Sequence, residues 1–195
     1  MLKVGITGGI GSGKSTFCAL LEKMGVPIFY SDQEAHALFA EDDIRRQVID
    51  LFGERAYQDG VLDRKWVGSI VFNDAGKLEA LNAIMRPAVR NRFNLWVLQQ
   101  KSDIVGMEAA ILIESGGHKS MDYIIVVTAS TDVRIERAMH RDGATKEQIE
   151  SRIAAQMSEE ERCGYADAII GNDGGLDELK PKVESALALL KKLAQ

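Results

Sequence analysis

The chain has 195 residues, of which 46% are hydrophobic and 27% are charged. That composition is typical of a globular domain, and no apolar stretch approaches the roughly 20 residues that a membrane-spanning helix needs. The formal net charge of −5 argues against a general nucleic-acid binder, because nonspecific affinity for nucleic acid comes from a surplus of Lys and Arg. The N-terminus has no leader pattern, and Cys18 and Cys163 are the only thiols. We therefore expect a cytoplasmic protein that binds neither membrane nor nucleic acid.

The first motif is a phosphate-binding loop. Residues 8–15 read G-G-I-G-S-G-K-S, the pattern G-x-x-x-x-G-K-[ST], and they follow a short apolar run at 2–7. In this motif glycines let backbone N–H groups converge on phosphate oxygens, Lys14 reaches the β- and γ-phosphates, and Ser15 ligates Mg²⁺. Apolar residues at helical spacing come next, which disfavours the alternative of a glycine-rich turn with a chance lysine. The predicted nucleotide-binding residues are Gly11, Ser12, Gly13, Lys14, Ser15 and Thr16.

Strand and helix patterns alternate along the chain. Continuous apolar runs predict buried parallel strands at 26–30, 104–113, 123–127 and 168–170. Helical spacing predicts helices at 78–99, 133–140, 147–157 and 179–193, and Thr145 with Gln148 forms a capping-box pattern before the third of these. With the first run at 2–7, the alternation predicts an α/β protein: a three-layer α/β/α domain with a five-stranded parallel sheet.

The connection between the second and third predicted strands is much longer than a plain βαβ crossover. Its sequence indicates an entirely helical segment with turns at Gly53, at Asp59–Gly60 and at 73–76. We expect a helical lobe beside the sheet, with Trp66 and Trp96 in its core or in a pocket wall.

Asp32 stands just after the second predicted strand. A carboxylate at the carboxyl end of a parallel strand faces the crevice beside the phosphate loop, where it can accept a proton from a substrate hydroxyl or help to hold Mg²⁺. The alternative is a helix N-cap for a segment that begins near Gln33, although Ser31 can fill that role instead. We favour the functional interpretation for Asp32, and a structural one for His36.

Three arginines, Arg134, Arg137 and Arg141, recur at helical spacing, and the last two share a face. Arginines beside the γ-phosphate neutralise charge during phosphoryl transfer, whereas a solvated face would pair them with Glu136 and Asp142. The residues alone leave both interpretations open.

For Arg152 and Arg162, closure over the nucleotide is less favoured than pairing with the glutamates around them, which are Glu150, Glu159, Glu160 and Glu161.

Glu108 interrupts the apolar run at 104–113, and Glu114 ends it. A carboxylate inside a buried strand is costly unless it is paired or near a metal, so Glu108 is a candidate for the substrate or Mg²⁺ crevice and Glu114 a weaker one. The D-I-V-G string at 103–106 precedes a strand, whereas the D-x-x-G motif of GTPases follows one. No N-K-x-D motif occurs either, so GTP is not expected.

Taken together, these motifs resemble the dephospho-coenzyme A kinase family along nearly the whole chain. The matching segments, in order, are G-I-T-G-G-I-G-S-G-K-S-T at 5–16, the stretch of Asp32 with Ala35–His36, I-L-I-E at 111–114, E-R-A-M-H-R-D at 136–142, R-I-A-A-Q at 152–156 and A-D-A-I-I-G-N at 166–172. The resemblance implies ATP-dependent, Mg²⁺-assisted phosphorylation of the ribose 3′-hydroxyl of dephospho-coenzyme A, the last step of coenzyme A synthesis. Another small-molecule P-loop kinase is the runner-up. A nucleotide-dependent switch is disfavoured because no guanine or switch motif is found.

The resemblance also implies a division of the chain: a core at 1–33, 101–140 and 164–195, a coenzyme-A-binding helical lobe at 34–100, and a helical lid at 141–163. Carried onto single residues, it makes Lys14 a ligand of the ATP phosphates, Asp32 similar to the family's proposed general base, and Arg137 and Arg141 phosphate-contacting arginines. The segment at 171–175, which includes Asn172, is implied to lie against adenine.

Two departures from the family pattern lie away from the phosphate loop. They are Arg86–Pro87, where His-Pro is common, and Ala110, where proline is common.

Overall fold

The computed structural model describes all 195 residues and contains two compact units. The first consists of Met1–Tyr30 and Gln100–Gln195, and the second is Ser31–Gln99.

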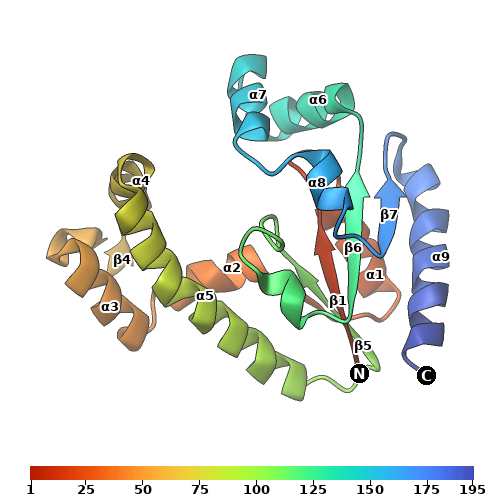
Figure 1. The fold of residues 1–195 in the computed structure, drawn as a ribbon, viewed down its shortest axis with the longest axis horizontal. Coiled ribbons are helices and arrows are strands. Elements are labelled where there is room, and N and C mark those ends of the chain that lie inside the picture. The colour runs from red at the N-terminus through yellow and green to blue at the C-terminus, as the bar shows by residue number, and fades with distance from the viewer. The chain divides into compact units, whose positions relative to one another are not determined.

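The first unit is built on a five-stranded sheet. Its strands are β1 (Leu2–Thr7), β2 (Ile28–Tyr30), β5 (Ile104–Glu108), β6 (Tyr123–Thr128) and β7 (Ala168–Gly171). They lie in the order β2-β5-β1-β6-β7, every neighbouring pair is parallel, and their carboxyl ends point to the same edge (Figure 1). The predicted five-stranded parallel sheet is confirmed, with β1 at its centre.

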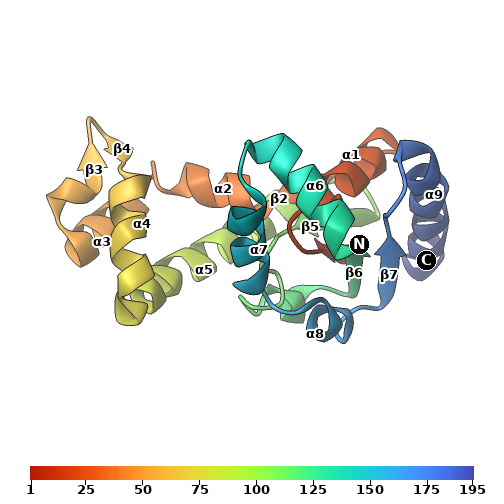
Figure 2. The same cartoon turned by 90° about the horizontal axis from the view of Figure 1, so that it is seen from above.

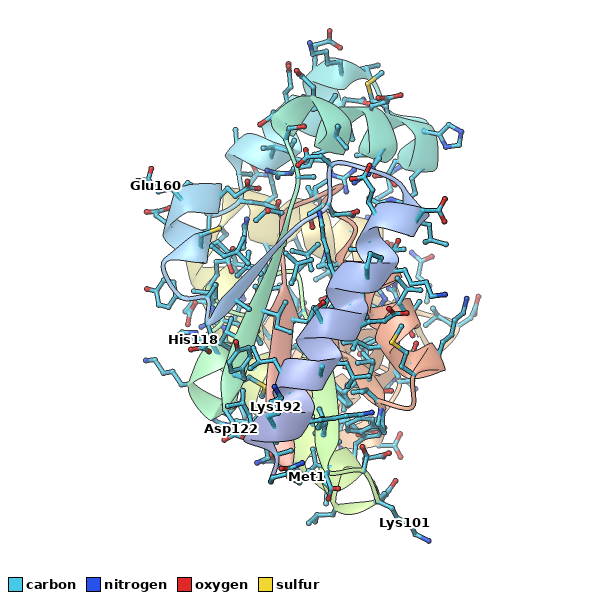
Figure 3. The ribbon with its side chains drawn as sticks, turned by 90° about the vertical axis from the view of Figure 1, so that its right-hand side faces the viewer. Met1, Lys101, His118, Asp122, Glu160 and Lys192 are labelled. Carbon is cyan, nitrogen blue, oxygen red and sulfur yellow. The ribbon has the colours of Figure 1, made fainter.

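Helices flank the sheet, as predicted. Those of the first unit are α1 (Lys14–Lys23), α6 (Thr131–Asp142), α7 (Lys146–Ala154), α8 (Glu159–Cys163) and α9 (Leu176–Leu193), with a 3-10 turn η2 (Gly117–Ser120). The side chains of α1 and α9 form one buried core with the sheet, which includes Ile6, Phe17 and Leu187. Figure 3 shows α9 lying across the strands, with Lys192 and Met1 toward the same end of the unit.

β5 is shorter than the sequence predicted. The strand ends at Glu108, and the chain then turns, with the Ser115 N–H bonded to the Ile111 carbonyl and the Gly116 N–H to that of Ile113. Leu112 remains buried within this turn. The apolar run at 104–113 is therefore an extended strand only in its first half, and in its second half Leu112 and Ile113 are buried whereas Ile111 is exposed.

α6, α7 and α8 follow β6 and precede β7. Figures 1 and 2 show α6 and α7 side by side beyond the carboxyl ends of the strands. They share a small apolar cluster that contains Ile135, Ala138 and Ile149. Thr145 and Gln148 form the predicted capping box of α7. α8 lies in the segment where a helical lid was expected, but its own bounds were not predicted, although Ser158 and Glu161 form a second capping box at its start.

The second unit has its own core. Its elements are α2 (Ser31–Leu38), α3 (Asp42–Phe52), η1 (Glu54–Ala56), β3 (Tyr57–Gln58), β4 (Val61–Leu62), α4 (Arg64–Asn73) and α5 (Ala75–Leu98). The buried cluster includes Leu38, Val48 and Val67, with Trp66 packed against it. The cluster joins α2, α3 and α4 into one folded body.

The prediction of an entirely helical insert was wrong at one place. β3 and β4 pair as a short antiparallel hairpin around Asp59–Gly60. Both turn residues have positive φ, 49° and 81°, the conformation of the two-residue turns that match strand twist. The Asp-Gly pair was the sequence signal for this hairpin.

No helix in the structure is long and apolar enough to cross a membrane.

Candidate active site

The phosphate loop connects the central strand β1 to α1 at the carboxyl edge of the sheet. Gly11 and Gly13 have φ of 76° and 91°, a region that disfavours side chains. A Cβ on Gly13 would also lie 2.1 Å from Asn172 Nδ2 and 4.0 Å from Arg137 Nη1. Glycine at position 13 therefore allows the loop, Asn172 and Arg137 to approach one another closely.

Lys14 begins α1 and points toward the end of the neighbouring strand β5. Its Nζ lies 3.7 Å from Glu108 Oε1, and the two side chains are only 15% and 8% exposed. Glu108 was a candidate for this crevice, and the structure brings it to the phosphate loop. Burial raises the pKa of the Cys18 thiol, and the negative charge of Glu108 adds to the increase. Cys18 is thus a protonated core residue rather than a nucleophile.

The other loop residues differ in their environments. Ser15 and Thr16 are exposed in the first turn of α1, whereas Ser12 is buried and its Oγ has no hydrogen-bond partner. The Ser12 carbonyl accepts a hydrogen bond from Asn172 Nδ2 at 2.8 Å. Asn172, predicted to lie in an adenine-side segment, is 6% exposed and fixes the loop that follows β7 to the phosphate loop.

Arg137 reaches the same place from α6. Its Nη1 donates to the Asn172 carbonyl and its Nη2 to the Gly174 carbonyl, both at 2.7 Å. The pairing with Glu136 that the sequence left open is not found among these bonds. Arg137 instead orders the loop at 172–174 and places its positive charge close to Gly13.

Arg141 lies elsewhere, at the exposed end of α6. Its Nε and Nη2 donate to the Asp142 carboxylate, which also accepts from Arg152 Nη1 at 2.6 Å. The hydrogen bond from Arg141, followed by that from Arg152, holds the pKa of Asp142 well below its usual range. In the structure Arg141 is therefore paired with Asp142 on a solvated helix face, and its side chain is 60% exposed.

Arg134 and Gln156 also contact the phosphate loop. Arg134 was one of the three arginines considered for a place beside the γ-phosphate, whereas no role was predicted for Gln156. Arg134 Nε donates to the Ile10 carbonyl at 2.9 Å, and the Ile10 N–H donates to Gln156 Oε1 at 3.0 Å. Burial lowers the pKa of Arg134, while its partner Glu159 raises it. Membership of Gln156 in the R-I-A-A-Q string was the only sequence signal, since the bond spans 146 residues.

Arg162 is the most deeply buried arginine of this unit, at 1% exposure. Its Nη2 donates to the Met157 carbonyl and lies 3.7 Å from Glu114 Oε1. Glu114 is thus a partner of Arg162, and the glutamates expected to pair with Arg162 and Arg152 are not their ion-pair partners.

Asp32 and His36 belong to the second unit. α2 starts at Ser31, so Asp32 is an exposed residue of its first turn rather than a residue before the helix. The chain leaves the sheet at Tyr30, whose register partner in β5 is Glu108. His36 Nδ1 lies 3.2 Å from Arg64 Nη1, a contact within the second unit.

The two departures from the family pattern also have local partners. Arg86 pairs with Glu79 at 3.4 Å in the second unit, and the Ala110 carbonyl accepts from Thr7 Oγ1 at 3.4 Å.

The donors beside the phosphate loop fit a divalent cation that arrives with a nucleotide. The Ser15 hydroxyl and the Glu108 carboxylate are oxygen ligands of the kind Mg²⁺ prefers, and Mg²⁺ usually completes its shell with substrate phosphates and water. No group of three or more His, Cys, Asp or Glu side chains in the structure is arranged to hold a metal ion.

Comparison with known proteins identifies the family of this chain. The family model for dephospho-CoA kinase matches residues 2–178. A dephospho-CoA kinase of Bacteroides fragilis (strain YCH46) is 43% identical over 196 residues, which cover 100% of this chain and 94% of that protein.

Solved structures extend the comparison to the fold. A crystal structure from Thermus thermophilus matches with a TM-score of 0.87 and 33% identity over 97% of each chain. A dephospho-CoA kinase from Campylobacter jejuni matches with a TM-score of 0.73 over 99% of this chain and 98% of that one. At 23% identity, the second match supports the fold alone. The family match spans the phosphate loop, the second unit and the first unit as far as the start of α9, and the chain belongs to the dephospho-CoA kinase family.

Proposed function

We propose that this protein transfers the γ-phosphoryl group of ATP to the ribose 3′-hydroxyl of dephospho-CoA, which yields CoA and ADP. The observation that carries the proposal is a complete phosphate loop at the central strand, with Lys14 opposite Glu108, in a chain of the dephospho-CoA kinase family. Phosphoryl transfer asks for positioning and charge stabilisation more than for covalent chemistry, and this site offers both.

Different residues of the chain have different roles in this reaction. The loop amides and Lys14 hold the phosphates, and Arg137 adds positive charge beside Gly13. Mg²⁺, held by Ser15 and aided by Glu108, would neutralise charge on the β- and γ-phosphates when bound. Asp32 orients the 3′-hydroxyl and accepts its proton, a role supported by its place two residues after β2.

The remaining roles belong to larger segments. The second unit binds the CoA portion of the substrate, and the segment 141–163 acts as a lid in which Arg141 exchanges Asp142 for nucleotide phosphate. Asn172 and its neighbours form the adenine side of the site. The two unpaired cysteines fit a reducing, cytoplasmic compartment.

The test is an acceptor panel in which ADP release is coupled to a spectroscopic readout. We expect a far higher kcat/KM with dephospho-CoA than with AMP, adenosine or shikimate, and a product that carries its new phosphate on the ribose 3′-oxygen. The reason is that a long insert with its own core offers binding energy that a small acceptor cannot use. A kcat/KM for AMP equal to that for dephospho-CoA would reassign the protein to the nucleotide kinases.

A further inference from the structure

Ile10, within the phosphate loop, has both of its backbone groups bonded to side chains from outside the loop. Its N–H donates to Gln156 Oε1 at 3.0 Å, and its carbonyl accepts from Arg134 Nε at 2.9 Å. These two bonds set the orientation of the peptide units on either side of Ile10, because rotating either unit would leave a polar group unpaired.

The two side chains are themselves connected. Arg134 is 5% exposed, and its Nη1 donates to Glu159 Oε2 at 3.1 Å. Gln156 lies in the turn between α7 and α8, and Glu159 is the first residue of α8. The segment 156–159 is therefore bonded to Ile10 twice, directly through Gln156 and indirectly through Arg134. We call Arg134, Gln156 and Glu159 the Ile10 clamp.

We propose that the Ile10 clamp orders the phosphate loop for nucleotide, and that Gln156 is its positioning residue. Gln156 acts through the Ile10 N–H rather than on the reacting atoms. A loop held in its binding conformation by the fold loses little conformational freedom when ATP binds, so the clamp strengthens nucleotide affinity. Its effect falls on ATP binding, and the acceptor and the chemical step are affected little.

Gln156→Met tests this role, because methionine has a similar length but no oxygen acceptor. We expect the KM for ATP, and the Kd of a nonhydrolysable ATP analogue measured calorimetrically without acceptor, to rise about three- to tenfold, the range for one lost neutral hydrogen bond. We expect kcat, the KM for dephospho-CoA and the thermal midpoint to stay close to the parent values.

Gln148→Met is the matched control. Gln148 Oε1 accepts from the Thr145 N–H at 3.0 Å, a glutamine-to-backbone bond of the same kind in the same part of the chain. That bond lies within α7 and its cap and does not reach the phosphate loop, so its loss should lower analogue affinity clearly less than Gln156→Met does. Equal losses of affinity in the two variants would show that weakening this helical segment suffices, and would overturn the proposal.

Ile10→Pro supplies an independent second variant, because proline removes the N–H that Gln156 accepts. The backbone tolerates the change in two respects: Ile10 has no positive φ, and the preceding Gly9 has no Cβ to clash with the proline ring. In the Ile10→Pro background, Gln156→Met should no longer lower analogue affinity. An undiminished effect there would mean that Gln156 acts by another contact.

The inference rests on the proposed function only in that the loop binds ATP. Analogue binding is measured without acceptor, so failure of dephospho-CoA as a substrate would overturn the proposed function and leave this test intact. A fall in kcat with unchanged analogue affinity would overturn the role of Gln156 and leave the proposed function standing.

Discussion

Single residues at the phosphate loop are held by partners from distant parts of the chain. Lys14 Nζ lies 3.7 Å from the Glu108 carboxylate. The Ser12 carbonyl accepts a hydrogen bond from Asn172, and the backbone of Ile10 is bonded to the side chains of Arg134 and Gln156. Because these side chains are largely removed from solvent, their interactions are screened less than those of a surface pair. The loop thus has a defined shape and a defined place for its one positive side chain.

The first prediction at this scale concerns that side chain. Lys14→Ala should lower kcat by at least about 10²-fold, because the charge that stabilises the transferring phosphoryl group is lost. The fold should persist, since the backbone bonds of the loop to Gln156 and Asn172 do not involve Lys14. Steady-state kinetics and a melting curve measure both effects.

Lys23→Ala is its control, since Lys23 is an exposed lysine in the last turn of the same helix. It should behave like the parent protein. Near-normal turnover of Lys14→Ala with ATP would contradict the assigned role.

The second prediction concerns Asp32. Asp32→Asn keeps the size of the side chain but cannot accept a proton, so kcat should fall by roughly 10²- to 10⁴-fold while ATP binding persists. If Asp32 organises Mg²⁺ instead, the loss should be partly restored by higher Mg²⁺. If Asp32 only stabilises the start of α2, the free energy of unfolding should fall by about 1 kcal/mol and kcat should not change.

Kinetics over a range of Mg²⁺ concentrations and the unfolding midpoint distinguish these three results. Asp42→Asn changes an equivalent exposed carboxylate in the first turn of α3, and it should alter neither measurement beyond a small loss of stability. A purely structural result for Asp32→Asn would remove it from the catalytic residues.

At the scale of elements, the segment after β6 has two parts that are held to the rest of the first unit by different contacts. α7 has one fully buried side chain, Ile149, and its contacts with α6 form only a small cluster. The later part contains Gln156, bonded to the phosphate loop, and the buried Arg162. Few buried contacts mean a low free energy of local opening, so the two parts should differ in mobility.

We therefore predict that an ATP analogue with Mg²⁺ slows amide exchange more at 141–155 than at 156–163. In the proposed function the first part closes over the nucleotide; it packs against Ile10 of the phosphate loop through the small apolar cluster, whereas the second part is hydrogen-bonded to that loop. Exchange followed by mass spectrometry measures this, with α9 as the internal reference that should not change. Unchanged exchange at 141–155, with binding verified separately, would refute its action as a lid.

At the scale of the whole molecule, folding and metal binding are expected to be independent. Since no cluster of carboxylate, imidazole or thiol groups forms a metal site, the protein should not need a metal to fold. We predict that excess EDTA leaves the thermal midpoint unchanged while it abolishes turnover, and that added Mg²⁺ restores turnover. A fall in the midpoint on chelation would indicate a resident structural metal.

The sequence by itself determined the features that depend on neighbouring residues. The phosphate loop, its strand and its helix are specified within residues 2–23, and the capping box of α7 within four residues. Apolar runs marked all five strands of the sheet, because strands covered on both faces are apolar throughout. The predicted burial was wrong for the edge strand β7, where Ile169 is 54% exposed. The same runs could not show where β5 ends, since buried turn residues such as Leu112 are equally apolar.

Only the tertiary structure decided which distant groups meet. Arg137 donates to carbonyls 35 and 37 residues away, and Gln156 accepts from an N–H 146 residues away. Arg134 and Arg141 have the same residue type and share one helix, yet one is buried against the loop and the other is exposed. Helical periodicity predicts on which face of a helix a residue lies, but not which residues of other elements that face contacts. Those neighbours are fixed by the order of strands in the sheet, which brings β1, β6 and β7 side by side and carries the segments between them to the phosphate loop.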